Sequence, residues 1–502
     1  MSGLTSETLV LLALCLPALG AVGIAIAARI PNLREAVTLT AAGANFVVVG
    51  TLLVRVLDGE RPVAGGWEVF GGIEIAFLVE PLGMLFATIA ATLWIVNSIY
   101  SIGYMRGNDE PRQTPFYICF AVAISAAIGI AFAGNLLTLF LFYEILTIST
   151  YPLVTHKGTD EAKAKGRVYL LLLLATSMLL LLPAIIWTWV AAGTMDFVPG
   201  GILATAGLST GAVGLLLAFY IFGIGKAAVM PVHFWLPAAM VAPTPVAALL
   251  HAVAVVKAGV FTVVKVIVYI FGIDFLAASG ANQWLIYVAG GTIILASLIA
   301  MTKDNLKARL AYSTISQLGY VVVGALLATP YGIIGSGMHI AMHAVGKITL
   351  FFCAGAIYTA AHKTKVSELA GLGRRMPFTF AAFLIASLSI IGLPPLGGLW
   401  SKWYLAIGAL DADQIFVLVA LMLSSLLNVA YLLPIPFRAF FGDSPPDAGR
   451  PGDIAGNEAP GGAIREAPLA CLIAIGLTAL GCVVLFFFPG PLLDLLAQIQ
   501  LR

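Results

Sequence analysis

Five ionisable residues interrupt stretches of this sequence that are otherwise apolar, and they are its strongest candidates for chemistry. They are Glu144, Lys226, Lys257, Lys347 and Lys402. A charge at the centre of a membrane segment costs at least about 2.5 kcal/mol, so such residues usually face a protein interior and mark an ion or substrate route. Hard metal cations take oxygen ligands, whereas an ammonium group only donates hydrogen bonds. The series therefore predicts a route for protons, which move by alternating protonation of the lysines.

Glu144 lies in the middle of the apolar segment NLLTLFLFYEILTISTYPL, residues 135–153, and is the one acidic residue well inside any predicted span. Two interpretations are open. Glu144 is either a structural carboxylate that pairs with a lysine to fix helix packing, or a switch for Lys226. Burial disfavours the charged form of a lysine and a nearby carboxylate favours it, so a small change in separation would change the protonation of Lys226. We favour the switch.

Four histidines accompany the lysines and are predicted to support the same route. His339, His343 and Lys347 recur every fourth residue in MHIAMHAVGKITLFF, which places them on one face of a helix. His233 and His251 lie close to prolines in a second apolar stretch. A membrane histidine can instead be a hydrogen-bonding tether, and two histidines four residues apart can bind a metal. No carboxylate or cysteine ligand is near in sequence, so we prefer a proton wire with no metal and no cofactor.

The apolar stretch around Lys226 and Lys257 is broken by four prolines. It covers residues 225–260, GKAAVMPVHFWLPAAMVAPTPVAALLHAVAVVKAGV. Prolines release backbone groups that lipid cannot satisfy, so broken membrane helices lie inside protein or beside water. A second break, GLPPLGGLWSKWYL at residues 392–405, combines prolines, aromatic residues and Lys402 in the same way. Interrupted helices at matching places in two halves are typical of inverted-repeat transporters.

Three further polar residues lie near this series. Lys265 follows Lys257 by eight residues, close to the same helix face, and either joins the route or extends its ammonium group to the membrane surface. Ser316 and Gln317, in AYSTISQLGY, are placed to hold water between the charged groups.

Composition identifies the class of protein. The 502 residues are 61% hydrophobic and 10% charged, with a mean hydropathy of +1.03, whereas soluble domains carry about 25% charged residues. Apolar runs long enough to cross a bilayer recur along the chain, which predicts an all-α polytopic membrane protein. No phosphate-binding glycine loop or nucleic-acid patch is present, and we interpret the five cysteines as packing residues. The first apolar run contains Glu7 and lacks a basic region, so we expect a retained helix there and not a signal peptide.

We expect fourteen spans, at residues 7–28, 35–55, 79–102, 115–133, 135–155, 167–192, 210–230, 243–272, 284–301, 310–328, 331–360, 378–400, 414–437 and 467–488. Loops after the odd-numbered spans hold nearly all of the arginines and lysines outside the spans, whereas loops after the even-numbered spans hold only Arg55 and Arg61. Because basic residues accumulate in cytoplasmic loops, both termini are predicted on the extracytoplasmic side. The Pro/Gly-rich insertion 442–466 is then cytoplasmic.

Five blocks of this sequence carry a resemblance to a known family. They are NLLTLFLFYEILTISTYPLV, GKAAVMPVHFWLPAAMVAPTPVAALLHAVAVVKAGVF, KDNLKARLAYSTISQLGY, HIAMHAVGKITLFFCAGA and GLPPLGGLWSKW. The chain resembles the antiporter-like membrane subunits shared by Mrp-type multisubunit cation/proton antiporters, respiratory complex I and membrane-bound hydrogenases. The resemblance covers nearly the whole chain.

The resemblance implies a fourteen-helix fold with two inverted five-helix repeats, spans 4–8 and 9–13, in which spans seven and twelve are broken. The implied parts are residues 1–114 for helices 1–3, 115–272 for the first repeat, 273–441 for the second, 442–466 for the cytoplasmic loop and 467–502 for helix 14.

The resemblance also implies roles for the residues. By position, Glu144 and Lys226 look like the family's glutamate–lysine pair, and Lys257 looks like its central lysine. His343 and Lys347 look like the family's relay in span eleven, and Lys402 looks like its exit lysine.

Within the superfamily, the length and the lysine at position 402 favour the D-type subunit of an Mrp antiporter, and the end of the chain after span fourteen predicts no long lateral helix. The implied function is proton translocation in a Na⁺/proton antiporter of a bacterial or archaeal cell membrane. Its partners would be other membrane subunits, further antiporter-like ones included, and it would have no catalytic chemistry, cofactor or nucleic-acid partner of its own. Two alternatives stay open: a redox-driven proton-pumping subunit of a complex I-like or hydrogenase complex, and a passive scaffold.

Overall fold

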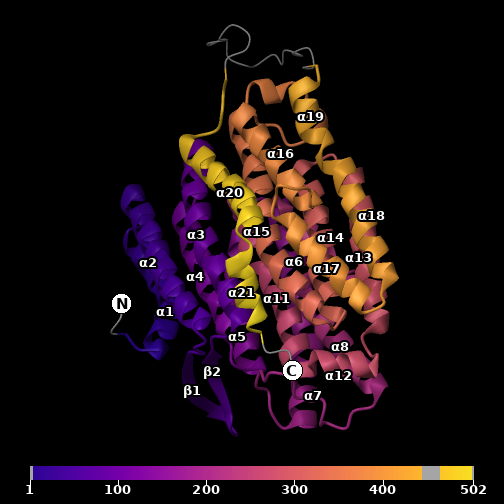
Figure 1. Cartoon of the computed structure of the whole chain (residues 1–502). Coiled ribbons are helices and arrows are strands. Elements are labelled where there is room, and N and C mark those ends of the chain that lie inside the picture. The colour runs from indigo at the N-terminus through magenta and orange to yellow at the C-terminus, as the bar shows by residue number, and fades with distance from the viewer. Residues whose placement is uncertain (1–3, 444–463, 500–502) are drawn as a thin grey trace.

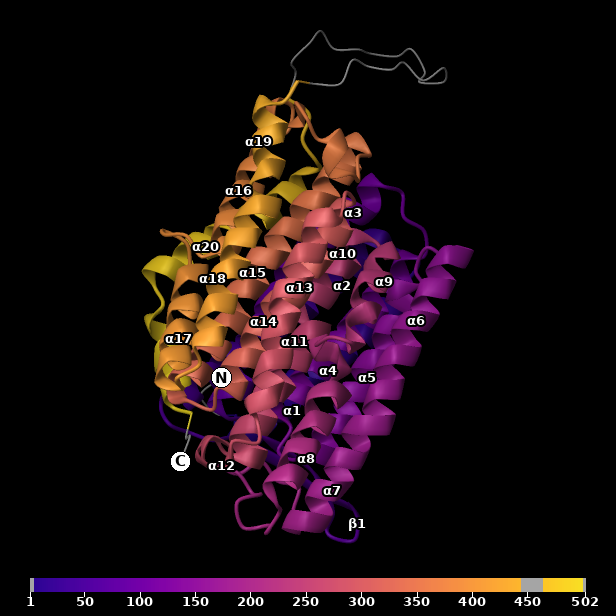
Figure 2. The ribbon, with the colours of Figure 1, turned by 90° about the vertical axis from the view of Figure 1, so that its right-hand side faces the viewer.

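Long, nearly parallel helices form a single bundle in the computed structural model, which describes residues 4–443 and 464–499 (Figure 1). The side chains of Phe70 and His251 lie outside this description. The bundle is closed at one end by a small β-hairpin and short helices (Figures 1 and 2). The helix ends and loops at the other end carry most of the basic residues that the structure describes.

The first part of the chain forms three long helices and the hairpin. Its elements are α1 (Ser6–Ile26), α2 (Pro31–Leu57), β1 (Val63–Phe70), β2 (Ile73–Leu78) and α3 (Pro81–Gly107). The strands pair antiparallel, with Val63 opposite Leu78. Gly65 lies where the pairing of β1 with β2 is irregular, and its φ is +102°. A Cβ here would lie 2.6 Å from a backbone oxygen of β2, so this position of the strand needs glycine. Nothing in the sequence pattern predicted β1 and β2.

The second part contains the first interrupted helix. It consists of α4 (Gln113–Phe132), α5 (Leu136–Val154), α6 (Asp160–Thr176) continued through η1 (Ser177–Leu181) into α7 (Leu182–Ala192), and α8 (Thr210–Gly223). A broken segment follows, made of η2 (Gly225–Ala227), η3 (Val232–Phe234), α9 (Trp235–Ala238) and η4 (Ala239–Val241). The chain then forms α10 (Thr244–Ala248), η5 (Leu249–Val253), α11 (Val255–Val266) and η6 (Ile267–Phe271).

The third part contains the second interrupted helix. Its elements are α12 (Ile273–Ser279), α13 (Gln283–Thr302), α14 (Leu306–Leu326), α15 (Pro330–Ala361), η7 (Val366–Glu368), η8 (Leu372–Arg374), α16 (Pro377–Ile391), α17 (Gly398–Asp411), α18 (Ile415–Leu432) and α19 (Pro434–Phe441). The chain continues through α20 (Leu469–Phe487) and α21 (Gly490–Ala497). α15 is nearly all buried and lies at the centre of the bundle (Figure 1).

Helices occupy every predicted span, but they are not all continuous. Within the described ranges, ten helices are each long and apolar enough to cross a membrane, or eleven if the pair Val255–Phe271 and Ile273–Ser279, bent by 80°, is one span. Thr210–Gly223 and Pro377–Ile391 are shorter because the proline-containing breaks end them. The chain is a polytopic, mostly helical membrane protein, as its composition predicts.

The two ends of the bundle differ in charge. We define the basic end as the one where α3 and α15 end and α4 and α14 begin, and the hairpin end as the opposite one. The described chain starts and finishes toward the hairpin end (Figure 1). Three helices are tied together at the basic end by charged and amide side chains.

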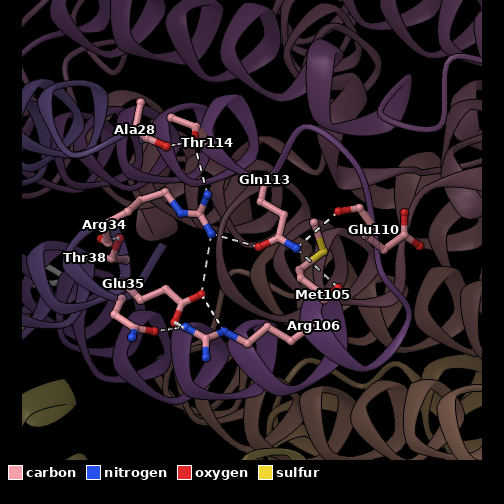
Figure 3. Close-up of polar contacts among 10 residues, drawn as sticks. Ala28, Arg34, Glu35, Thr38, Met105, Arg106, Glu110, Gln113 and Thr114 are labelled. Atoms are coloured by element: carbon pink, nitrogen blue, oxygen red, sulfur yellow. Dashed lines mark hydrogen bonds and ion pairs between the residues drawn. The ribbon is translucent and has the colours of Figure 1, made fainter. Parts of the chain in front are cut away.

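Figure 3 shows this network, which joins α2, α3 and α4. Glu35 is buried, and its carboxylate accepts hydrogen bonds from Nε and Nη2 of Arg106 at 3.0 and 2.5 Å. Arg34 lies 3.5 Å from the same carboxylate and donates to Oε1 of Gln113 at 2.8 Å. Two arginines therefore share one buried carboxylate, which holds the ends of α2 and α3 together.

We predict that Glu35→Gln lowers the thermal stability of the protein, because it leaves Arg34 and Arg106 without their counter-charge. Breaking a buried ion pair by removing one partner costs about 3–5 kcal/mol, and the half-exposed side chain of Arg106 reduces this to about 2 kcal/mol. Thermal unfolding in detergent measures the effect. Glu74→Gln, on an exposed position of β2, is the matched control, and equal melting temperatures for the two variants would contradict the prediction.

Candidate functional site

Lys226 lies in the first break, in η2, and is fully buried. Its ammonium group donates to the backbone oxygen of Tyr143 at 2.9 Å and to Oγ1 of Thr147 at 2.6 Å, both on α5. The same nitrogen lies 3.1 Å from the centre of the Tyr143 ring. A Cβ at Gly259 of α11 would lie 2.3 Å from the backbone beside Lys226, so glycine permits the break to pack against α11. The break thus delivers a lysine to the middle of the bundle.

Glu144 follows Tyr143 on α5, but it does not contact Lys226. Its side chain is nearly buried, and neither carboxylate oxygen has a hydrogen-bond partner in the described part of the chain. The ion pairs within 4 Å among these residues do not include Glu144 and Lys226. The carboxylate of Glu144 and the ammonium group of Lys226 are therefore more than 4 Å apart in this structure, and the switch stays a prediction.

Lys257 on α11 is joined directly to His343 on α15. The distance between Nζ of the lysine and Nδ1 of the histidine is 2.6 Å, and both side chains are buried. An ammonium group and an imidazolium have only donors, so at least one of the two nitrogens must be unprotonated to accept this bond. The pair can therefore hold one proton between them and pass it from one helix to the other.

His339 lies one turn before His343, with the two rings stacked and their centres 5.8 Å apart. Nδ1 of His339 is 2.9 Å from Oγ of Ser401 on α17, and its ring stacks on Tyr320 of α14 with centres 5.2 Å apart. The two histidines thus continue from Lys257 toward the second break.

Lys402 lies on α17, just after the second break. Its ammonium group donates to the backbone oxygen of Ile391 at 2.8 Å and to Oγ of Ser425 at 2.9 Å. It lies 5.0 Å from the centre of the Tyr320 ring, and the hydroxyl of Tyr320 is 3.4 Å from Ser425. Tyr320 therefore contacts both His339 and Lys402.

Lys347 shares the α15 face with His339 and His343, as predicted, but its ammonium group turns to another partner. It donates to Oγ of Ser313 on α14 at 2.6 Å, and the hydroxyl of Tyr431 donates to the same oxygen at 2.9 Å. Lys347, Ser313 and Tyr431 therefore form a separate polar group, which lies toward the basic end, where α14 begins.

The remaining predicted residues lie elsewhere. His233 is buried in η3, beside the rings of Phe234 and Tyr312. Ser316 bonds with Ser297 and Ser424 at 2.9 and 3.1 Å, and Gln317 is buried next to it. The side chain of His251 is outside the described residues, although the backbone at this position belongs to η5.

Sequence reasoning did not single out Glu80, which holds Lys265. Lys265 is fully buried, and its ammonium group lies 3.1 Å from Oε1 of Glu80 and 2.8 Å from the backbone oxygen of Ala133. Glu80 also caps the start of α3, and the hydroxyl of Tyr269 donates to it at 3.1 Å. Of the two interpretations, extension to the membrane surface is therefore wrong. The dipeptide Glu80-Pro81 signals a helix start, but no local pattern pairs it with Lys265.

Comparison with known proteins gives one family and several relatives. The family described as NADH:quinone oxidoreductase/Mrp antiporter, TM matches residues 133–428. NADH-quinone oxidoreductase subunit N of Desulforudis audaxviator is 31% identical over 93% of this chain and 92% of that protein. The A/B component of a probable K⁺/H⁺ antiporter of Rhizobium meliloti is 29% identical over 76% of this chain, which spans only 38% of that protein.

The same fold occurs in a solved membrane complex. A chain of the Mrp complex from Dietzia sp. DQ12-45-1b superposes with a TM-score of 0.85 at 24% identity, covering 99% of this chain and 97% of that chain.

The Lys257–His343 contact generates a prediction about energetic coupling. If one proton is shared between them, Lys257→Met and His343→Gln should each slow proton movement through the complex about tenfold or more, and the double variant should be no slower than the worse single one. Proton uptake into vesicles measures all three. Multiplying losses in the double variant would show that the two residues act separately.

Proposed function

This chain belongs to the NADH:quinone oxidoreductase/Mrp antiporter transmembrane family, and we propose that it is the proton-translocating subunit of a multisubunit monovalent cation (Na⁺)/proton antiporter. Members of this family are multi-pass membrane subunits of cation/proton transport systems. The finer assignment draws support from the likeness to the Mrp complex over almost the whole chain and from the antiporter relative.

One observation carries the proposal: a series of basic side chains runs from α11, which packs against the first break, to Lys402 at the second break. Lys257 and His343 are in contact, His339 stacks on His343, and Tyr320 lies between His339 and Lys402. These side chains can hold and release protons but offer no cage of oxygen ligands for a metal cation. We assign proton transfer to this chain, and cation transfer to the assembled complex.

The first break supplies the switch. Lys226 is held by neutral oxygens of α5, while the carboxylate of Glu144, on the same helix, has no hydrogen-bond partner among the described residues. A rotation or shift of α5 against η2 would bring the carboxylate to the ammonium group and favour its protonated form. Return to the separated arrangement would favour release of the proton toward Lys257.

We also propose the fourteen-span organisation, with spans 4–8 and 9–13 as inverted repeats. The helix order supports it. In spans 4–8, the fourth span is interrupted after α8, and Lys226 follows the interruption. In spans 9–13, the fourth span is interrupted after α16, and Lys402 follows the interruption. The first of these sets enters the bundle from the basic end at α4 and the second from the hairpin end at α13, as inverted repeats must. The boundaries proposed are 1–114, 115–272, 273–441, 442–466 and 467–502.

The setting follows from charge and family. We place the basic end in the cytoplasm of a bacterial or archaeal cell and both termini outside, because basic loops stay on the cytoplasmic side. We propose other membrane subunits as partners, further antiporter-like chains among them. They are the expected site of Na⁺ passage.

A redox-driven proton-pumping subunit of a complex I-like or hydrogenase complex is the second candidate. The observation that favours it is the Desulforudis relative, an NADH-quinone oxidoreductase subunit of nearly the same extent as this chain. The residues would keep the same roles, and an electron-transfer partner would supply the energy.

Inverted vesicles that contain the complete native complex distinguish the two candidates. A proton gradient is imposed without an electron donor, Na⁺, K⁺ or Li⁺ is added, and the internal pH is followed. We predict a cation-dependent collapse of the gradient that Lys257→Ala abolishes. Lys303→Ala, which removes a lysine from a loop at the basic end, is the control and should leave it unchanged. Pumping only on addition of a reductant would select the redox-driven candidate.

The switch gives its own prediction. Glu144→Gln should slow proton movement at least about tenfold, because a neutral amide cannot stabilise the ammonium group of Lys226. Glu144→Asp keeps the charge and should retain part of the rate. The control Glu74→Gln makes the same change on the exposed hairpin. Equal rates for wild type and Glu144→Gln, with normal insertion, would leave Glu144 a packing residue.

A further inference from the structure

A cavity of about 510 Å³ lies at the basic end, between the two halves of the chain. One wall comes from the start of α6 and from the end of the first break, residues 237–244. The other wall comes from the start of α14 and the end of α15. Pockets that hold small-molecule ligands measure about 300–1,000 Å³, so this space is large enough for one.

Four lysines from three parts of the chain line the cavity: Lys157, Lys165, Lys307 and Lys363. Glu161 is the one carboxylate in the lining. Among the described residues, no carboxylate lies within 4 Å of any of these lysines. Lys307 donates to the backbone oxygen of Ala242 at 2.8 Å, at the end of the break. The lining therefore carries a surplus of positive charge without a bound counter-charge.

A neighbouring carboxyl group only partly offsets this surplus. Glu110 lies in the loop after α3, where burial raises the pKa of its carboxyl group while Lys157 and Lys307 lower it. Its one ion pair within 4 Å is with His156, at 3.9 Å. Burial, and then the charge of Lys157, lower the pKa of the Lys307 ammonium group to about 7, so the positive charge of the lining rests mainly on Lys157, Lys165 and Lys363.

Two helices also begin at the cavity wall. The cap residues of α6 and α14, Thr159 and Asn305, both line it, so the positive ends of both helix dipoles lie at the wall. Asp160 and Glu161 in the first turn of α6 reduce the positive potential at the start of this helix. The first turn of α14 has no acidic residue. The field of α14 therefore adds to that of the lysines.

We propose that this cavity binds a phosphate-bearing anion, either the headgroup of an anionic phospholipid or a free phosphate compound. A phosphate group brings up to two negative charges and several acceptor oxygens, so one group can accept from more than one ammonium at once. Basic pockets between membrane helices at this level are suited to phospholipid headgroups. Tyr104, Tyr358 and Thr244 provide further hydroxyl groups in the lining.

Occupancy would tie the two halves of the chain together. The anion would contact α6 and the break on one side and α14 and α15 on the other, and Lys307 already joins α14 to the end of the break. The first break carries Lys226, so a bound anion would stabilise the element that positions this lysine. The binding itself does not depend on the proposed transport function.

Binding to the complete purified complex tests the proposal in two arms. In nanodiscs of neutral phosphatidylcholine, equilibrium binding of radiolabelled inorganic phosphate and pyrophosphate is measured. In nanodiscs that also contain an anionic phospholipid, native mass spectrometry counts the lipid molecules retained. The cavity variant is Lys157→Gln with Lys363→Gln, two exposed positions. Its matched control, Lys163→Gln with Lys303→Gln, removes the same charge outside the cavity lining.

We expect saturable binding in at least one arm, weakened about tenfold or more by the cavity variant and less than about twofold by the control. Binding of the free anions identifies a soluble ligand, and retention of the lipid alone identifies a headgroup. Lys307→Gln should weaken the same binding, and helix content confirms that each variant is folded. Absence of saturable binding in both arms, or equal weakening by the control, would overturn the proposal.

Discussion

An ammonium group in the interior of an apolar helix bundle needs acceptors, and this constraint organises the structure. Each lysine of the series, fully buried except for the partly buried Lys402, has one or two acceptors within 3 Å: backbone and hydroxyl oxygens for Lys226 and Lys402, a hydroxyl for Lys347 and an imidazole for Lys257. All of these acceptors are neutral. A neutral acceptor tolerates both protonation states of a lysine, whereas a carboxylate strongly favours the charged one.

Lys265 shows the contrasting case. It forms an ion pair with Glu80, and Glu80 is itself held by the first turn of α3 and by Tyr269. These contacts of Glu80 suit a structural ion pair that holds α3 and α11 together. Charge-pairing therefore distinguishes Lys265 from the lysines that we propose exchange protons.

Helix ends provide two of the acceptors that lysines use here, and one of the two lies at a break. The last carbonyl groups of a helix lack partners within it. Lys402 takes up the carbonyl of Ile391 where α16 ends, and Lys265 takes up that of Ala133 where α4 ends. An interrupted membrane helix is tolerated because the ammonium group donates a hydrogen bond to the free backbone carbonyl. The ammonium group is tolerated because this carbonyl accepts the bond. At the second break, the free carbonyl group and the lysine thus stabilise each other.

The sequence by itself determined the membrane class, the apolar segments that form the long helices, and both breaks, and it predicted residues for carrying protons. These depend on local properties: apolar run length, prolines, and the cost of a charge in lipid. Only the tertiary structure decided the partners. Lys257 and His343 are 86 residues apart in the sequence, and Glu144 forms no ion pair within 4 Å with Lys226 although both groups lie at α5. Helix rotation and packing depend on the whole bundle, so no local pattern contains them.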